Sequence, residues 1–167
     1  MSISIRRMNE QDIPTIMESI QVLDWNRDDS VYRQYLEEQH QGLREVYVAL
    51  YHDLFAGHIN LIWQPPYKAF QERGIPEISD LIVLPQFRRK GLASALMDEC
   101  EAAAKESSAW CGLGVGLYKD YGPAQALYAR RGYQLDCLGA TSHLKPIIPG
   151  TNVFVDDDLL IWMVKKL

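Results

Sequence analysis

The stretch SDLIVLPQFRRKGLASAL, residues 79–96, decides how this chain is interpreted. Its apolar run from Leu81 to Leu84 ends at Pro85 and predicts a strand, and the segment from Gly91 onward starts a helix that reaches about Lys105. A helix N-terminus carries unpaired N–H groups and the positive end of the helix dipole, and a glycine there lets the backbone approach a ligand closely. The stretch therefore predicts a phosphate-binding turn. The plainer alternative is a solvated basic turn between a strand and a helix.

The turn does not match the common nucleotide-binding motifs. Neither GxxxxGK[ST] nor GxGxxG is present, which excludes a P-loop and the dinucleotide-binding fingerprint. Further along the chain, AQALYARRGY, residues 124–133, predicts a helix that runs into a strand. Together the two segments resemble the GNAT superfamily of N-acetyltransferases. Its signatures are (Gln/Arg)-x-x-Gly-x-(Gly/Ala) and Asn-x-x-Ala-x-x-Leu-Tyr-x-x-x-Gly-(Phe/Tyr), and the resemblance covers about residues 76–134.

The resemblance implies an α/β (α+β) fold. Its central sheet is mixed and mostly antiparallel, is flanked by helices, and contains parallel fourth and fifth strands that splay apart. Hydrophobic periodicity agrees with this order, and Asn9 and Asp12 are placed to form a capping box on the first helix. One domain is expected over residues 1–167. Strands are expected at residues 2–7, 44–51, 56–63, 75–84, 110–117, 133–138 and 159–164, and helices starting near residues 10, 30, 91 and 122.

The same resemblance implies acetyl-CoA as the co-substrate, bound between the strands at 78–84 and 110–117. Its pantetheine arm would pair with the backbone of Leu81, Ile82 and Val83, and an N–H group near Ile82 would stabilise the oxyanion. Tyr121 replaces the Asn that often begins the second signature, and with Tyr128 it completes the expected cofactor contacts. The pyrophosphate would lie on the residues of the turn and the first helical turn, Arg88, Arg89, Lys90, Gly91, Leu92, Ala93 and Ser94.

Three residues are candidates for the proton transfers. An alkylammonium must lose a proton before it attacks the thioester, and the resemblance places Glu77 and Asp80 on the strand beside it. Strand alternation puts the two acids on opposite faces, and Glu77 matches a position from which some family members supply a base. Glu77, Asp80 and water all remain candidates for the base. Tyr128 matches the family tyrosine that returns a proton to the leaving thiolate.

The acceptor site has weaker sequence signals. The resemblance places Trp25, Asp28 and Asp29 on one side of it and residues 156–158, three aspartates, on the other. An aromatic ring and carboxylates would suit a cationic amine, but Trp25 in the core and solvated acids are the plainer alternative. We therefore expect acetyl transfer to a primary amine of a small, cationic molecule. A protein or peptide N-acetyltransferase and a non-catalytic acyl-CoA-binding module are the alternatives.

Composition limits the partners. The 167 residues include 17 Lys and Arg against 22 Asp and Glu, and the net charge of −5 argues against binding to nucleic acid. Three cysteines without a CxxC motif and four histidines without an HxxxH pair predict neither a disulfide framework nor a metal site. No apolar stretch approaches the roughly 20 residues that span a bilayer, and no secretory signal is recognised. A cytoplasmic protein without membrane contact is expected. A homodimer is expected from family habit and the apolar last strand.

Overall fold

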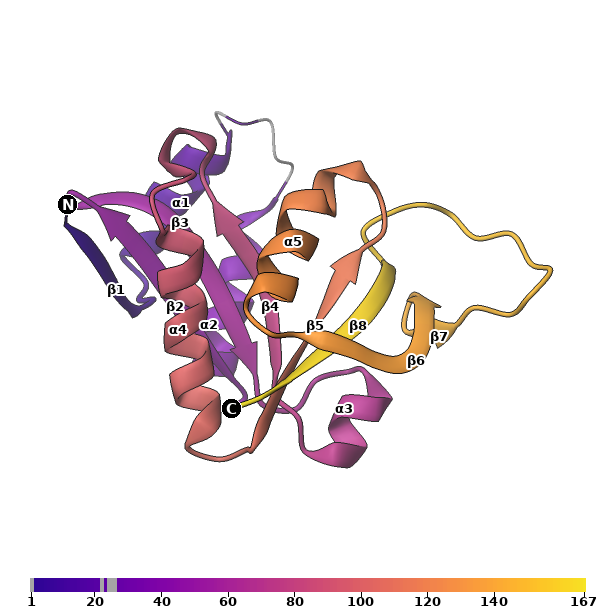
Figure 1. The fold of residues 1–167 in the computed structure, drawn as a ribbon. Helices are drawn as coiled ribbons and strands as arrows, with labels where there is room; N and C mark the ends of the chain where they lie inside the picture. The colour runs from indigo at the N-terminus through magenta and orange to yellow at the C-terminus, as the bar shows by residue number, and fades with distance from the viewer. Residues whose placement is uncertain (1, 22, 24–26) are drawn as a thin grey trace. The chain divides into compact units, whose positions relative to one another are not determined.

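The computed structural model describes residues 2–21, 23 and 27–167, which divide into two compact units. The first unit comprises residues 1–63 and 78–103, and the second comprises residues 64–77 and 104–167. In the first unit lie β1 (Ile3–Arg7), α1 (Asp12–Gln21), α2 (Asp29–His40), β2 (Arg44–Tyr51), β3 (Leu54–Ile62), and most of β4 (Glu77–Val83) and α4 (Leu92–Lys105) (Figure 1). In the second lie α3 (Lys68–Arg73), β5 (Trp110–Gly116), α5 (Gly122–Arg130), β6 (Gln134–Ser142), β7 (Lys145–Pro146) and β8 (Leu159–Lys166).

The first unit is built on the strand order β1-β2-β3-β4. β2 pairs antiparallel with both β1 and β3, and Val46 and Val48 alternate onto one face of the sheet. That face packs against α1 and α2, whereas α4 covers the other face (Figure 1). Residues that share the core with the two valines are Met8, Ile13, Ile16, Ile20, Tyr32, Leu36, Phe55 and Leu84.

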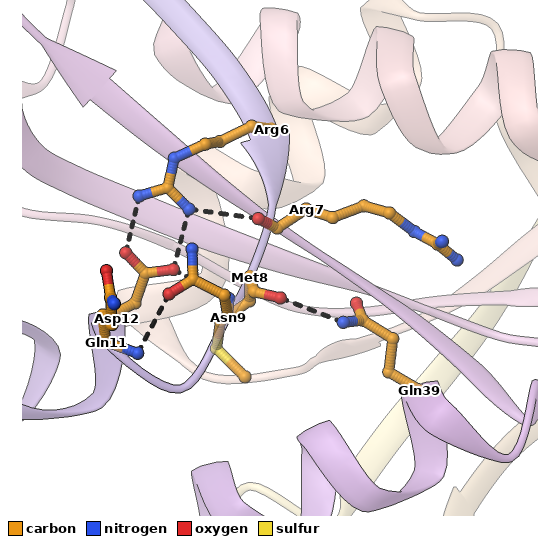
Figure 2. A network of polar contacts seen from close by, with 7 residues as sticks. All are labelled: Arg6, Arg7, Met8, Asn9, Gln11, Asp12 and Gln39. Atoms are coloured by element: carbon orange, nitrogen blue, oxygen red, sulfur yellow. Dashed lines mark hydrogen bonds and ion pairs between the residues drawn. The ribbon is translucent and has the colours of Figure 1, made fainter.

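A capping box starts α1, as the sequence predicts. The Asn9 side chain accepts a hydrogen bond from the Gln11 N–H at 2.9 Å, and the Asp12 carboxylate accepts one from the Asn9 N–H at 2.8 Å (Figure 2). The Arg6 guanidinium donates to both Asp12 oxygens, at 2.8 and 2.6 Å. The bidentate ion pair therefore joins β1 to the first turn of α1.

The second unit has the strand order β5-β8-β6-β7. β8 pairs antiparallel with every residue of β5 and also pairs antiparallel with β6. Trp162 of β8 is 1% exposed, stacks on Tyr67 with ring centroids 3.9 Å apart, and donates to the Thr141 hydroxyl at 2.9 Å. Glu77, the first residue of β4, belongs to this unit and pairs in parallel with Gly112 of β5.

The expected fold class is confirmed: an eight-stranded, mostly antiparallel sheet with β4 and β5 parallel, accompanied by helices. Residues 68–73 form α3, between the expected strands β3 and β4. β6 extends four residues beyond its expected end. Cys137 and Gly139 adopt φ values of 67° and 83°, and this interruption hides the alternation on which the predicted end depended. The short strand β7 was not expected. A single domain over residues 1–167 stays a prediction.

A search of the described residues finds no helix that is both long and apolar enough to cross a membrane.

Candidate active site

The predicted site residues fall in both units, and each group is described within its own unit. Asp80, the backbone of Leu81–Val83 and the phosphate-binding turn lie in the first unit, whereas Glu77, Tyr121 and Tyr128 lie in the second. Three further side chains near Asp80, which sequence reasoning missed, belong to the first unit: Arg27, Tyr35 and His58.

The predicted phosphate-binding turn joins β4 to α4. A 3-10 turn at Pro85–Phe87 follows β4, the chain then turns at residues 88–91, and α4 begins at Leu92. Gly91 has a φ of 87°, and a Cβ built there meets no atom within 4 Å. The first N–H groups of a helix have no acceptor within the helix. The open space at Gly91 and these N–H groups fit a diphosphate.

The three basic residues of the turn are exposed but differ in their contacts. Arg88 donates through Nε to the Val83 carbonyl at 3.2 Å, and the Lys90 ammonium lies 5.0 Å from the centre of the Tyr51 ring. Arg89 has a φ of 62°, and its side chain makes no hydrogen bond or ion pair within the described part of the chain. Arg89 is therefore the basic side chain most available to an anion.

The backbone of β4 turns its polar groups alternately toward and away from β3. A Cβ built on Gly57 of β3 would lie 2.2 Å from the Ile82 carbonyl oxygen, and the Leu84 N–H donates to the Ala56 carbonyl at 2.9 Å. Residues 82 and 84 therefore face β3, and alternation turns the polar groups of Leu81 and Val83 away from it. This direction favours Leu81 and Val83, rather than Ile82, as N–H donors to a ligand.

Asp80 lies in a bulge of β4, with a φ of 51°. For a residue other than glycine this conformation costs of order 1 kcal/mol, although Asp tolerates it better than most. The Arg27 guanidinium donates to both Asp80 oxygens, each at 2.6 Å, and the Tyr35 hydroxyl donates to Oδ2 at 3.1 Å. Burial alone would raise the pKa of Asp80, but the His58 ring and then these hydrogen bonds outweigh it and lower that pKa.

His58 completes this polar cluster from β3. Its ring is fully buried, with Nδ1 3.9 Å from Asp80 Oδ2 and Nε2 3.3 Å from the Tyr32 hydroxyl. Burial, aided by the charge of Arg27, lowers the pKa of His58 despite the opposing effect of Asp80, so the imidazole is neutral at pH 7. Asn60 lies two residues further on the same face of β3 and is also fully buried. A polar residue at every second position of a strand is the sequence signal that could have found both.

Glu77 and Tyr128 are the candidate base and acid, and both are buried, at 8% exposure each. Tyr128 lies on α5 with its ring centroid 6.1 Å from that of Tyr133. Burial raises the pKa of Tyr128 to about 12, so its hydroxyl is protonated at physiological pH. The catalytic roles of Glu77, Asp80 and Tyr128 stay predictions.

Tyr121 has a structural partner within the second unit. Its hydroxyl donates to Asp157 Oδ1 at 2.8 Å, the Tyr118 hydroxyl donates to the same oxygen, and a Cβ built on Gly116 would lie 2.2 Å from the Tyr121 ring. Burial and then this carboxylate raise the pKa of Tyr121. Tyr121 thus holds the loop before β8, a contact that the Asn of the family signature is too short to make in the same way.

The predicted acceptor acids also have local partners. Asp28 caps α2 by accepting from the Ser30 N–H at 2.8 Å, and Asp29 pairs with Arg33 at 3.0 Å. Both aspartates line a groove of about 480 Å³ that also includes Arg27. Trp25 lies outside the described residues. His143 lies 4.0 Å from Asp156 and 3.5 Å from Asp158.

Residues 11–133 match the model of the acetyltransferase (GNAT) family. The chain belongs to the GNAT acetyltransferase family. The match includes both signature segments, from the β4–α4 turn to the end of α5. No curated protein matches the chain in sequence.

Solved structures of GNAT acetyltransferases share the fold. An N-acetyltransferase from Staphylococcus aureus Mu50 has a TM-score of 0.74 at 15% identity, over 99% of each chain. The ribosomal-protein-alanine N-acetyltransferase of Brucella melitensis has a TM-score of 0.72 at 21% identity, over 98% of this chain and 99% of that one. The PaiA N-acetyltransferase of Thermoplasma acidophilum, in complex with coenzyme A, has a TM-score of 0.65 at 16% identity, over 100% of each chain. At these identities the likeness shows the fold alone.

Proposed function

We propose that this protein is an N-acetyltransferase that transfers the acetyl group of acetyl-CoA directly to a primary amine of a small molecule. Family membership brings acetyl-CoA as the co-substrate. The turn between β4 and α4 carries the proposal, because Gly91 leaves open space beside the first N–H groups of α4 and Arg89 is available to an anion. The bound thioester supplies the activated acetyl group.

The first unit would hold the donor along β4 and α4. Residues 88–94 would bind the pyrophosphate, and the backbone of 81–83 would pair with the pantetheine arm. Because the polar groups of Leu81 and Val83 turn away from β3, their N–H groups are the proposed donors to the thioester carbonyl and its oxyanion. Ile82, whose carbonyl turns toward β3, would contribute mainly through its side chain.

Glu77 is the proposed base, directly or through water, and Tyr128 the proposed acid. Asp80 is a weaker base, because Arg27 and Tyr35 already hold its carboxylate and its pKa is lowered. The Tyr128 hydroxyl would hydrogen-bond the departing sulfur. Tyr121, whose hydroxyl is held by Asp157, would contact the donor through its ring.

The acceptor is proposed to be a small amine, and a polypeptide N-terminus is the second candidate. Asp28 beside the groove supports a cationic acceptor, although Arg27 and Arg33 also line the groove and Arg33 already pairs with Asp29. The second candidate is supported by the likeness to a structure named as a ribosomal-protein-alanine N-acetyltransferase. Asp156–Asp158 are proposed as further acceptor contacts, although Asp157 already accepts from two tyrosines.

Release of free thiol from acetyl-CoA tests the proposal. The purified protein is incubated with acetyl-CoA and a panel of polyamines, amino-acid derivatives, aminoglycosides and peptides with N-terminal Ala or Ser. Turnover with a small amine above the rate of acetyl-CoA hydrolysis is the expected result, and turnover with peptides alone would favour the second candidate. Binding of acetyl-CoA without turnover on any acceptor would favour a non-catalytic acyl-CoA-binding module.

Two further proposals concern the state of the protein. The three cysteines, all described, form no disulfide, which supports a reducing compartment such as the cytoplasm. The apolar last strand no longer supports a homodimer, because β8 lies between β5 and β6 and Trp162, Met163 and Val164 are buried. A homodimer is now supported by exposed apolar residues near β6 and β8, such as Phe154 at 85% exposure. Light scattering that finds only monomer would reject it.

A further inference from the structure

The start of α2 is tied to the bulge of β4 by one ion pair. Arg27 lies two residues before α2, and its Nη1 and Nη2 groups donate to Asp80 Oδ2 and Oδ1, each at 2.6 Å. Tyr35 of α2 adds a third hydrogen bond to Asp80 at 3.1 Å. The Arg27 and Asp80 side chains are 32% and 11% exposed, so the pair is partly shielded from water. Two parallel N–H···O bonds fix the orientation of a carboxylate as well as its position.

The bulge that this pair holds decides the direction of the following backbone. Asp80 adopts a φ of 51° within a strand, and the residues after it resume alternation with Ile82 and Leu84 toward β3. An extra residue in a bulge changes which of the following residues face each neighbour. If Asp80 relaxed to extended backbone, the N–H groups of Leu81 and Val83 would turn from their present direction. The orientation of those donors therefore depends on what holds Asp80.

We propose that Arg27 is a positioning residue for acetyl transfer, which acts through Asp80 to aim the Leu81 and Val83 N–H groups at the thioester end of acetyl-CoA. This inference rests on the proposed function. Arg27 also lines the groove beside Asp28 and Asp29, but in this role it acts through Asp80 and not on the donor or the acceptor amine. Because it would act at the thioester end alone, its loss should leave the binding of the CoA phosphates at residues 88–94 largely intact.

His58 offers a readout of the same ion pair that needs no acetyl-CoA. Its Nδ1 lies 3.9 Å from Asp80 Oδ2, and the other groups that face it are Arg27, the Tyr32 hydroxyl and, across Asp80, Tyr35 of α2. On β2 the residue opposite His58 is the uncharged Val48. Without Arg27, the Asp80 carboxylate would lose its cation, and His58 would be the nearest group able to supply one. The pKa of His58 should then rise.

The first unit contains a matched control for the loss of an ion pair. Arg6 and Asp12 form the same bidentate geometry, at 2.8 and 2.6 Å, with side-chain exposures of 40% and 12% (Figure 2). That pair joins β1 to α1, and two strands, β2 and β3, lie between β1 and β4 in the sheet. The variants R27M and R6M therefore remove equivalent ion pairs and differ in whether β4 loses its anchor.

The experiment compares the wild type, R27M, R27K and R6M. Calorimetry gives the affinities for acetyl-CoA and for CoA, NMR titration follows the His58 ring, and the best acceptor of the panel gives kcat and KM. In R27M we expect kcat to fall about tenfold to a hundredfold, in line with the cost of a misplaced catalytic group. The affinity ratio of acetyl-CoA to CoA should fall, CoA affinity should change less than about twofold, and His58 should titrate at higher pH.

R27K keeps the positive charge but cannot form two parallel hydrogen bonds to the carboxylate. Its kcat, affinity ratio and His58 titration should therefore lie between those of the wild type and R27M, and it replaces R27M in the comparison if R27M does not fold. R6M should lose thermal stability and keep the wild-type affinity ratio, kcat and His58 titration. An R27M protein that loses thermal stability but keeps the wild-type kcat, affinity ratio and His58 titration would overturn the inference. If the wild type acetylates no acceptor, the proposed function fails, and the affinity ratio and the His58 titration still decide whether Arg27 positions β4.

Discussion

The pKa of Tyr128 decides how its hydroxyl could assist the departing thiolate. Its pKa, raised to about 12 by burial, keeps the hydroxyl protonated at every physiological pH. A thiol with a pKa near 8.5 is the stronger acid, so complete transfer from a phenol of this pKa to the free thiolate is uphill. Tyr128 would therefore act by hydrogen bonding as the charge on sulfur develops, rather than by giving up its proton early.

Replacing Tyr128 with Phe removes the hydroxyl and keeps the ring in its place beside Tyr133. We expect turnover to fall at least about tenfold, since acid–base groups typically contribute about 10²–10⁴-fold, while the thermal midpoint changes little. Tyr133→Phe is the control, because it removes the neighbouring hydroxyl, which lies 3.0 Å from Cys111 Sγ. Turnover is measured where chemistry limits the rate, and a Tyr128→Phe variant with full turnover would make Tyr128 a packing residue.

At Gly57 the backbone of β3 lies close to the backbone of β4. Alanine there would place its Cβ 2.2 Å from the Ile82 carbonyl oxygen, a backbone atom that cannot move aside without displacing β4. We expect Gly57→Ala to lower the free energy of unfolding by about 1–3 kcal/mol, the usual cost of overpacking, and to weaken acetyl-CoA binding. Gly122→Ala is the control, because a Cβ there meets nothing within 4 Å. The free energy of unfolding is measured with denaturant and acetyl-CoA affinity by calorimetry. Equal values for the two variants would contradict the prediction.

At the scale of elements, the sequence predicted the parts whose causes are local. The Asn9–Asp12 capping box, the alternation of β2 and the turn at Gly91 depend on neighbouring residues, and the structure contains all three. The bulge at Asp80 could not be predicted, because its anchor Arg27 lies 53 residues away in the chain. The partners of His58 could not be predicted for the same reason, although the spacing of His58 and Asn60 marks the strand face on which they lie. β7 is too short to produce a pattern.

Binding of the CoA pyrophosphate at the turn before α4 can be tested by mutation. Arg89→Ala should weaken CoA binding about two- to fivefold, since an exposed charge contact contributes about 0.3–1 kcal/mol. It should also reduce the dependence of the affinity on salt, because a screened contact has been removed. The matched control is Lys68→Ala, an 83% exposed cation on α3. Equal affinities and equal salt dependence for both variants would place the pyrophosphate elsewhere.

For the whole molecule, stability should fall in two steps as the pH is lowered. The pKa of His58 is lowered by burial, so the unfolded chain binds a proton below about pH 6.5 that the folded protein resists. The pKa values of Asp12, Glu38 and Asp80 are lowered because hydrogen bonds and nearby charges outweigh their burial. Their stabilisation is complete above the unfolded value near pH 4 and is lost as the pH falls through the folded values.

Thermal unfolding between pH 7.5 and 3 measures both steps. We expect the midpoint to fall already between pH 6.5 and 5.5 in the wild type, and His58→Gln should remove this first decrease because it removes the titrating group. His40→Gln, at an exposed position of α2, should retain it. A wild-type midpoint that stays constant down to pH 5 would show that the first step does not exist.

The place of β8 has a consequence for synthesis. β8 follows β5 and β6 in the chain but lies between them, and every residue of β5 pairs with it. When the ribosome has synthesised the chain up to residue 150, every strand of the first unit is present, but β5 still lacks its pairing partner β8. The first unit can therefore begin to fold during translation, whereas the second must wait until Leu159–Lys166 has emerged. Until then the β5 edge is the part of the nascent chain most exposed to wrong pairing and most suited to a holding chaperone.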